Sequence, residues 1–150
     1  MPHSIIIPKK FTPRSDREYF EILAKSIFQA GFNWHIVERK WPSITKAFLG
    51  FDLYRVSRMT DHDLDQLLKN PGVIRNGRKI QAIIENARKI RQLSKEHGSF
   101  RKFLSSNRTW KYPERRKFLV KQFASVGQTA LFVFLYTVNE PVPHWHRRKG

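Results

Sequence analysis

The sequence predicts an all-α fold in which helices pack around one apolar helix near the C-terminus. Apolar residues recur at spacings of three and four through most of the chain, and no segment alternates apolar and polar residues over a useful length. From Ala130 to Tyr136 the only polar group is the tyrosine hydroxyl. Because a helix that is apolar on every side has to lie inside a core, we expect about residues 130–138 to form the central helix of a helical bundle.

The length and composition predict one self-sufficient domain. A chain of 150 residues can bury its own core, and without cysteine it has neither disulfides nor cysteine-bound zinc. We expect a single domain over residues 1–150, with an extended arm at 1–14 and a basic tail at 141–150. The run Ile5-Ile6-Ile7 is too short for a signal peptide, and no stretch reaches the length of a membrane span. We therefore expect a cytoplasmic monomer that does not contact a membrane.

Side chains that can cap helices precede four segments in the first half of the chain. The capping residues are Ser15, Asn33, Asp52 and Asp61. The helices that they open are expected at residues 15–29, from 34 to near 48, 53–59 and 62–69. Ser15 and Glu18 have the spacing of a capping box, and Pro42 is expected to bend or restart the second helix.

The second half contains the longest amphipathic helix, expected at residues 77–96 after a tight hairpin at 70–76. Its apolar side is formed by Ile80, Ile83, Ile84, Ala87, Ile90 and Leu93. Ser99 is expected to cap a short helix that ends at Ser105. A basic helical segment at 112–122 then leads to the central helix.

The distribution of charge indicates a polyanionic partner. The formal net charge is +17, and the segment from Gly98 to the end has 11 basic residues against 2 acids, a net charge of +9. An excess of this size is typical of proteins that bind nucleic acid. Membrane binding is the weaker alternative. The apolar side of each basic helix has the pattern of a core-facing surface, and no further apolar face is evident that could enter a membrane.

The segment Val126-Gly-Gln-Thr129 is a candidate phosphate site at the start of the central helix. Gly127 can take a positive φ there, and the first turn of a helix has unpaired N–H groups that attract anions. The basic segment before this turn places Lys121 close to it. A helix, a tight turn and a second helix would suit a DNA phosphate. The alternative is an ordinary glycine-capped turn between two helices.

Three blocks occur in order: Ile27-Phe-Gln-Ala-Gly-Phe-Asn-Trp34, then Asn70-Pro-Gly-Val-Ile-Arg-Asn-Gly-Arg-Lys-Ile80 with Asn86-Ala87, then Phe123-Ala-Ser-Val-Gly-Gln-Thr129 running into Phe134-Leu-Tyr136. Together they resemble the DNA-3-methyladenine glycosylase I family of helix-hairpin-helix DNA glycosylases, over about residues 17–140. The resemblance implies a helix-hairpin-helix glycosylase-like bundle. It also implies an enzyme of base excision repair that flips an alkylated purine such as 3-methyladenine from double-stranded DNA and hydrolyses its N-glycosidic bond without a cofactor.

The same resemblance assigns roles to individual residues. Trp34 matches the tryptophan that stacks on the flipped base, Phe32 matches the apolar residue inserted into the duplex, and Gly31 lets that turn come close. The residues of the phosphate-gripping hairpin are Ser125, Gly127 and Thr129.

Several of these residues have a purely structural alternative. Trp34 is also interpretable as plain core, because aromatic residues at helical spacing usually are. Arg75, Asn76 and Lys79 are candidates for phosphate contacts, or for stabilising their own hairpin.

The chain departs from the family pattern at the pocket and at both ends. Ser26 stands where the family usually has a glutamate that hydrogen-bonds the damaged base, eight residues before Trp34. The N-terminal aromatic segment is absent. The family's zinc clasp uses cysteine and histidine near the two ends of the chain, whereas the ends of this chain offer only His3, His144 and His146. We interpret these as surface histidines, so that no metal is expected.

Glu38 and Glu140 are the candidate carboxylates for contacting the base or activating a water. Glu38 lies one turn beyond Trp34, with pairing to a surface Lys or Arg as the alternative. Glu140 follows the central helix, near where relatives place an acid. An alkylated purine leaves as a neutral base, so binding and desolvation can supply much of the acceleration. The alternative function is a non-catalytic DNA-binding protein, which Ser26 favours and the presence of Trp34 and Phe32 together disfavours.

Overall fold

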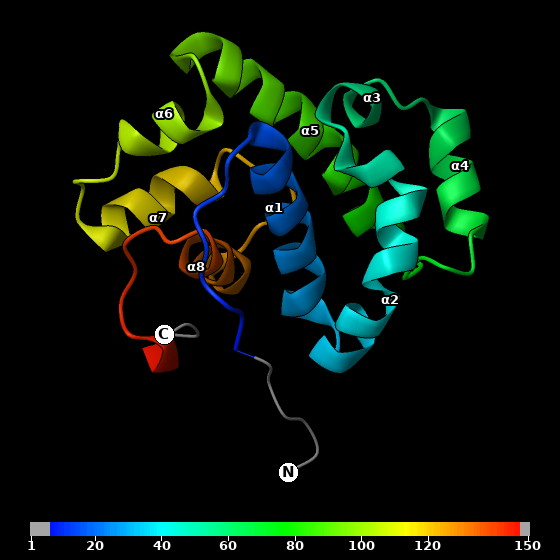
Figure 1. The fold of residues 1–150 in the computed structure, drawn as a ribbon, viewed down its shortest axis with the longest axis horizontal. Helices are drawn as coiled ribbons and strands as arrows, with labels where there is room; N and C mark the ends of the chain where they lie inside the picture. The colour runs from blue at the N-terminus through cyan, green and yellow to red at the C-terminus, as the bar shows by residue number, and fades with distance from the viewer. Residues whose placement is uncertain (1–6, 148–150) are drawn as a thin grey trace.

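The computed structural model describes residues 7–147, and all regular structure in this range is helical. In Figure 1, α8 is seen nearly end-on between α7 and α1, and α2, α3 and α4 lie on the other side of α1. The elements are α1 (Asp16–Gly31), α2 (Trp34–Ala47), η1 (Leu49–Phe51), α3 (Leu53–Ser57), α4 (Asp61–Lys69), α5 (Gly77–His97), α6 (Phe100–Ser105), α7 (Tyr112–Val120), α8 (Gln128–Thr137) and η2 (Trp145–Arg147). The predicted all-α class is confirmed.

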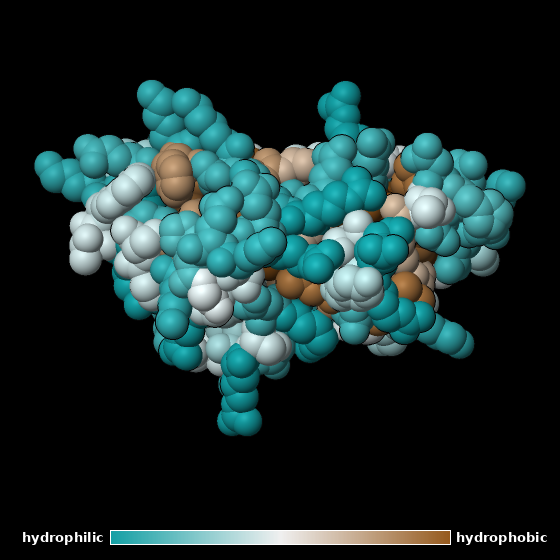
Figure 2. Space-filling model, turned by 90° about the horizontal axis from the view of Figure 1, so that it is seen from above, coloured by the Kyte–Doolittle hydropathy of each residue, from teal (hydrophilic) through white to brown (hydrophobic). Residues whose placement is uncertain are grey.

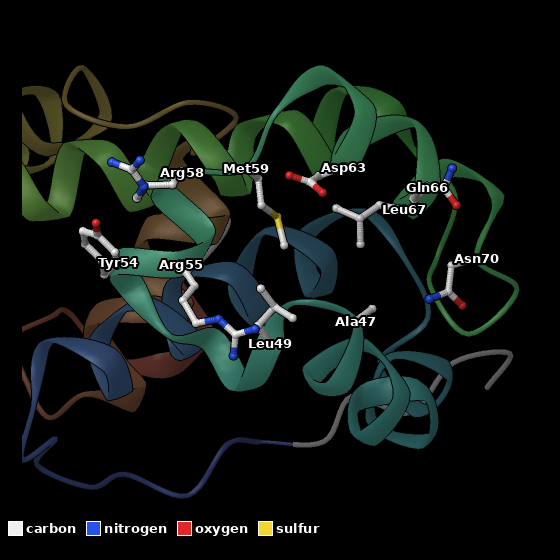
Figure 3. A pocket seen from close by; sticks show the side chains of 10 residues that line it. All are labelled: Ala47, Leu49, Tyr54, Arg55, Arg58, Met59, Asp63, Gln66, Leu67 and Asn70. Carbon is white, nitrogen blue, oxygen red and sulfur yellow. The ribbon is translucent and has the colours of Figure 1, made fainter.

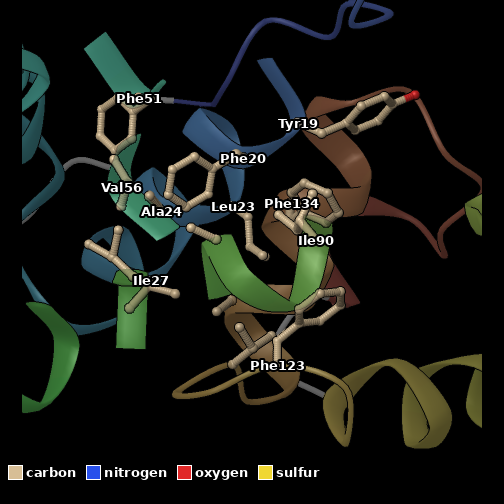
Figure 4. Close-up of a cluster of buried hydrophobic side chains, with 14 of the residues drawn as sticks. Tyr19, Phe20, Leu23, Ala24, Ile27, Phe51, Val56, Ile90, Phe123 and Phe134 are labelled. Carbon is tan, nitrogen blue, oxygen red and sulfur yellow. The ribbon is translucent and has the colours of Figure 1, made fainter. Parts of the chain in front are cut away.

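Helices α1, α5 and α8 meet in the core, which α2, α3 and α6 also line. Phe20, Leu23 and Ile27 of α1 meet Ile90 of α5 and Phe134 of α8, and none of these five side chains is exposed (Figure 4). Helix α8 is buried along nearly its whole length, as expected for the central helix. Each such aliphatic or phenyl side chain stabilises the fold by roughly 1.5–3 kcal/mol through burial.

The N-terminal arm crosses the end of α8 before α1 begins (Figure 1). The backbone N–H of Phe11 donates to the Thr137 carbonyl at 2.9 Å, and the Asn139 amide lies 3.4 Å from the Thr12 hydroxyl. The arm therefore satisfies a carbonyl in the last turn of the central helix, where no intrahelical donor remains.

Two of the predicted caps differ in detail. Ser15 accepts from the Glu18 N–H, but the Glu18 carboxylate takes the N–H of Arg14 rather than that of Ser15, so the capping box is only half formed. The cap of α4 is Thr60 and not Asp61. Thr60 forms a complete capping box with Asp63, which leaves Asp61 as the first residue of the helix. A carboxylate there still favours the positive end of the helix dipole.

Helix α2 continues through Pro42 instead of restarting. Proline removes one hydrogen bond to the preceding turn, and that cost is smallest where water can take the freed carbonyl. Pro42 is exposed, whereas Val37, Trp41 and Ile44 on the opposite side are buried. The apolar side therefore stays continuous and holds α2 together to Ala47.

A left-handed turn follows α2 and reverses the chain into α3. Leu49, Gly50 and Phe51 have φ values of 57°, 69° and 58°. Such a backbone costs about 1–3 kcal/mol at each residue that is not glycine. The compensation comes from Phe51, which is fully buried and stacks on Trp41 with ring centroids 5.3 Å apart.

The surface carries the positive charge that the composition requires. Figure 2, seen from above relative to Figure 1, shows a face covered mostly by hydrophilic residues with small apolar patches. Among the residues described, no helix is long and apolar enough to cross a membrane.

Candidate functional site

Helices α7 and α8 and the turn between them form a helix-turn-helix unit with an open end. Gly127 could take a positive φ, but the positive φ of this turn is found at Ser125, with a φ of 55°, while Gly127 has a φ of −91° that any residue can adopt. Gly127 is the N-cap of α8 and offers no side chain to the first turn. A Cβ added there would meet nothing within 4 Å. The N–H groups of the first turn of α8 are therefore approachable from outside.

Asn86 of α5 holds this turn by a reciprocal pair of hydrogen bonds. Its amide nitrogen donates to the Ala124 carbonyl at 3.0 Å, and its amide oxygen accepts from the Ala124 N–H at 2.7 Å. Asn86 is 1% exposed. Two hydrogen bonds from a buried amide fix the backbone just before Ser125, so the unusual conformation there is supported from the core.

The side chains around the turn face solvent. Lys121, Ser125 and Gly127 are exposed, and Thr129 is half-buried. An approaching phosphate would thus meet a flexible ammonium, a hydroxyl and backbone N–H groups, a combination that binds anions without reading sequence.

The second hairpin lies between α4 and α5. Two of its three candidate side chains form hydrogen bonds that stabilise the hairpin itself or the neighbouring helix α1. Asn76 caps α5 by accepting from the Lys79 N–H. Lys79 donates to the Ile27 carbonyl at 2.9 Å near the end of α1, and burial lowers the pKa of its ammonium. Arg75 is exposed. Asn76 and Lys79 thus have the structural contacts that the alternative interpretation expects, whereas Arg75 stays the candidate for a phosphate contact.

The turn between α1 and α2 fits around Lys79. A Cβ on Gly31 would come within 2.9 Å of the last carbon and the nitrogen of Lys79, so a side chain there would displace the ammonium. Phe32 is half-buried, 6.2 Å from the Phe28 ring, with the Lys79 ammonium 6.0 Å from its own ring centre. Gly31 therefore serves the packing of this turn, in addition to any close approach of DNA.

Trp34 begins α2 and belongs to a group of four aromatic residues. Its indole N–H donates to the Gln29 carbonyl at 2.6 Å, and its ring meets that of Trp145 edge-to-face, with centroids 6.0 Å apart. Trp145 also contacts Phe132 and Tyr136 of α8, at 6.0 and 4.5 Å. We call Trp34, Phe132, Tyr136 and Trp145 the aromatic cluster.

Ser26 is fully buried on α1, and its hydroxyl donates to the Ile22 carbonyl of the preceding turn at 2.8 Å. This is the arrangement expected of a helix-packing residue, because the hydroxyl donor is satisfied within its own helix. The hypothesis that Ser26 faces the base thus gains no support from its hydrogen bonding.

The candidate carboxylates are both ion-paired. Glu38 is exposed and lies 2.8 Å from the Lys25 ammonium, the pairing foreseen as its alternative role. Glu140 is buried and binds two guanidinium groups: both of its oxygens accept from Arg108, and one also accepts from Arg115 at 2.8 Å. Arg115 is itself 1% exposed and donates to Asn107 and to the Leu104 carbonyl.

This network makes Glu140 a structural residue. Its charge compensates the buried guanidinium of Arg115, which would otherwise be very costly, and three hydrogen bonds hold its two oxygens in place. Both carboxylates are thus held in ion pairs, and a role in contacting the base or activating a water stays a hypothesis for each.

The tail histidines lie side by side. The Nδ1 atoms of His144 and His146 are 2.7 Å apart, and no group of three potential ligands occurs within residues 7–147. His3 lies outside the described residues.

A separate hollow of about 430 Å³ opens between the end of α2, η1, α3 and α4 (Figure 3). Tyr54, Arg58 and Asp63 are among its lining residues, and none of the predicted site residues lines it. The Tyr54 ring is already flanked by the guanidinium groups of Arg58 and Arg91, at 5.4 and 4.8 Å. We assign this hollow no part in base binding.

The sequence profile of the methyladenine glycosylase family matches residues 11–131. The chain belongs to this family. It is 35% identical over 95 residues to DNA-3-methyladenine glycosylase 1 of Escherichia coli, covering 63% of this chain and 51% of that protein. It is 33% identical over 90 residues to the DNA-3-methyladenine glycosylase of Haemophilus influenzae, covering 60% and 49%. The chain thus spans about half the length of these curated relatives.

Solved structures of methyladenine glycosylases share the fold. The crystal structure of a 3-methyladenine DNA glycosylase I superposes with a TM-score of 0.74 at 28% identity, covering 85% of this chain and 81% of that one. A Staphylococcus aureus 3-methyladenine DNA glycosylase I, described for its recognition of 3-methyladenine, gives a TM-score of 0.77 at 22% identity, covering 91% and 89%. At that lower identity the likeness shows the fold alone.

Three features of the site were missed in the sequence. Asn86 was quoted within a family block but given no task, although a polar residue between Ile83 and Ile90 on the apolar side of a helix signals a buried hydrogen bond. Arg115 stands in the basic run Arg115-Arg116-Lys117, and nothing in that run shows that its guanidinium is buried. Trp145 was placed in a basic tail, and its size was the only signal that it packs on something.

Proposed function

We propose that this protein is a DNA glycosylase that hydrolyses the N-glycosidic bond of an alkylated purine such as 3-methyladenine in base excision repair. The observation that carries the proposal is the combination, in one family member, of an open, core-supported turn at α8 with an aromatic cluster at Trp34. The turn suits a phosphate, and the cluster suits a flipped purine ring. The curated relatives are named for action on 3-methyladenine.

The partner is double-stranded DNA that contains a damaged base. Lys121, Ser125 and the N–H groups after Gly127 bind the phosphate backbone, together with Thr129 and Arg75. Such contacts position the protein on the duplex without reading its sequence. Phe32, two residues before Trp34, fills the space that the extruded nucleotide leaves in the stack. A monomer is sufficient, because all of these residues come from one chain.

The chemistry follows from the leaving group. The base in an alkylated purine nucleotide is cationic, so it departs as a neutral molecule with the electron pair of the glycosidic bond. Water forms the new bond to the sugar carbon and releases its proton to solvent. Because Glu38 and Glu140 are ion-paired, the protein contributes by stacking on the base, excluding bulk water and orienting the sugar rather than by general base catalysis.

A non-catalytic DNA-binding protein is the second candidate, and the site itself favours it at one point. The position of the usual base-reading glutamate is Ser26, whose hydroxyl is bonded within its own helix. Such a protein would keep the phosphate grip of the α7–α8 turn and bind methylated and undamaged duplexes equally.

One experiment separates the two functions. Purified protein is incubated with methylated duplex DNA, and released bases are identified by chromatography. We expect the parent protein to release 3-methyladenine and Trp34→Ala to release it about 5- to 150-fold more slowly. Trp110→Ala is the matched control, because Trp110 is an exposed tryptophan that packs on Phe118, outside the aromatic cluster. Tight DNA binding without any released base would favour the second candidate.

A further inference from the structure

Trp145 occupies the aromatic surface that the proposed function needs for the base. Its indole meets the rings of Trp34, Phe132 and Tyr136 with centroids 4.5–6.0 Å apart. A purine is a flat, bicyclic ring system of nearly the same size as indole. Trp34 is 9% exposed with Trp145 in this place, so its ring has little surface left for another planar group.

The C-terminal segment that carries Trp145 is held in place by residues that precede Trp145, and not only by the aromatic cluster. Glu140 is buried in its arginine network, and Val142 is half-buried against the core. The chain from Pro143 to Arg147 is half-buried or exposed, and Arg147 donates its N–H to the His144 carbonyl in the short turn η2. Trp145 can therefore leave the cluster by a change in the segment that follows Val142, with α8 and the Glu140 network unchanged.

Beside the cluster there is already a hollow of about 290 Å³, lined by Phe132, Tyr112, Pro143 and Arg147 among others. Two of these residues belong to the same C-terminal segment. A displacement of that segment would join the hollow to the volume of the Trp145 indole, beside the rings of Trp34 and Phe132.

We propose that Trp145 is an intramolecular occupant of the base site, and that a flipped purine base binds by displacing it from Trp34, Phe132 and Tyr136. This inference rests on the proposed function and names the residues of its site: Phe132 and Tyr136 join Trp34 as base-binding residues. An occupant of this kind lowers the affinity for every base by the same factor, because the site must first be vacated. The occupant therefore raises the concentration at which any base fills the site, but it leaves the ratio of the affinities for two bases unchanged.

The size of that factor follows from the ring contacts. Each edge-to-face or offset aromatic pair contributes a factor of about 2 to 10 beyond simple burial, and Trp145 makes three such pairs, of which the base re-forms a part. We expect the removal of Trp145 to tighten base binding by about tenfold.

The test measures binding of two free bases, 3-methyladenine and 7-methylguanine, to the parent, Trp145→Ala and Trp110→Ala by calorimetry. Trp145→Ala should bind both bases about tenfold more tightly, with their ratio unchanged, and Trp110→Ala should match the parent. In a Trp110→Phe background, saturating 3-methyladenine should increase the quenching of tryptophan fluorescence by acrylamide, because Trp145 moves into solvent. Tyr136→Leu in the Trp145→Ala protein should weaken the binding again.

Weaker binding by a folded Trp145→Ala protein would show that Trp145 lines the base site, and it would overturn the proposal. A changed ratio of the affinities for the two bases, unchanged affinities or no binding of either base would overturn it as well. Failure of the proposed function gives a different pattern: the parent would release no base from methylated DNA, while binding of 3-methyladenine and exposure of Trp145 would still be seen.

Discussion

Asn86 and Ala124, 38 residues apart, exchange two hydrogen bonds at 3.0 and 2.7 Å, and through them helix α5 holds the turn that precedes α8. The strained residue Ser125 follows directly. The open N-terminus of α8 is thus positioned by a buried side chain of α5, and the turn that we propose to bind phosphate is supported from the core.

Asn86→Leu should weaken DNA binding and lower stability together. The variant leaves the N–H and carbonyl of Ala124 without partners, which costs about 1–3 kcal/mol for each buried group. Duplex affinity should fall as well, since the turn loses its support. Asn86→Asp keeps the acceptor for the Ala124 N–H, but it adds a buried charge whose second oxygen faces the Ala124 carbonyl, so it should destabilise the turn as well. Filter binding and thermal unfolding measure the two effects, and an Asn86→Leu protein with parental affinity would separate the turn from DNA binding.

The sequence could predict what depends on local pattern. The 3.6-residue periodicity of α5, the apolar run of α8 and the caps at Ser15, Asn33 and Asp52 are all short-range signals. The contacts that build the site are long-range. No local pattern shows that Asn86 meets Ala124, or that Trp145 packs on Trp34.

Local alternatives of nearly equal quality also misled the prediction. Thr60 and Asp61 are both good caps, and only the spacing from Thr60 to Asp63 decides between them. A glycine near a turn suggested the positive φ at Gly127, but the hydrogen bonds from Asn86 fix the chain so that Ser125 takes it.

Gly127→Asp should weaken DNA binding while leaving the fold intact or slightly more stable. Position 127 has a φ that any residue adopts and open space for a Cβ, and an aspartate at the N-cap can accept from the first turn of α8. Its charge, however, faces the phosphate. A salt series should show a lower affinity and a slope in log K against log salt that is smaller by about one. Gly127→Ser caps the helix without the charge and should keep most of the affinity.

Trp34→Ala should reduce base release by about 5- to 150-fold, the value of one base–aromatic stack, with undamaged-duplex affinity nearly unchanged. Stacking on the flipped base contributes only after extrusion. Trp34→Phe separates the ring from the hydrogen bond to Gln29, and it should retain part of the activity. Single-turnover kinetics and duplex binding check the prediction. Should activity fall only in proportion to the unfolded fraction, Trp34 would be plain core.

Glu140→Gln should destabilise the protein by about 3–5 kcal/mol without abolishing base release by the molecules that remain folded. The change leaves Arg115, which is buried, without its counter-charge. Denaturant unfolding gives the loss of stability, and excision is measured well below the new midpoint. A stable Glu140→Gln protein with no activity would restore Glu140 as a catalytic candidate. Glu38→Gln, which breaks only an exposed pair with Lys25, should change neither property noticeably.

Ser26→Glu decides whether position 26 faces the base. The side chain of Ser26 is fully buried and its hydroxyl is bonded to Ile22, so a glutamate there has to desolvate its carboxylate among apolar neighbours. We expect a loss of several kcal/mol in unfolding free energy, with no gain in selectivity. Ser26→Ala should be close to neutral, because it removes only a hydrogen bond within the helix.

The measurement pairs unfolding with the competing excision of 3-methyladenine and 7-methylguanine from one methylated substrate. A carboxylate that reached the base would make a charge-assisted contact and discriminate strongly between the two, since a wrong base would leave it unpaired. A stable Ser26→Glu protein with a raised preference for 3-methyladenine would therefore place Ser26 in the base site. A destabilised protein with an unchanged ratio would leave base recognition to the aromatic cluster, where stacking accepts any purine whose glycosidic bond is already weakened by alkylation.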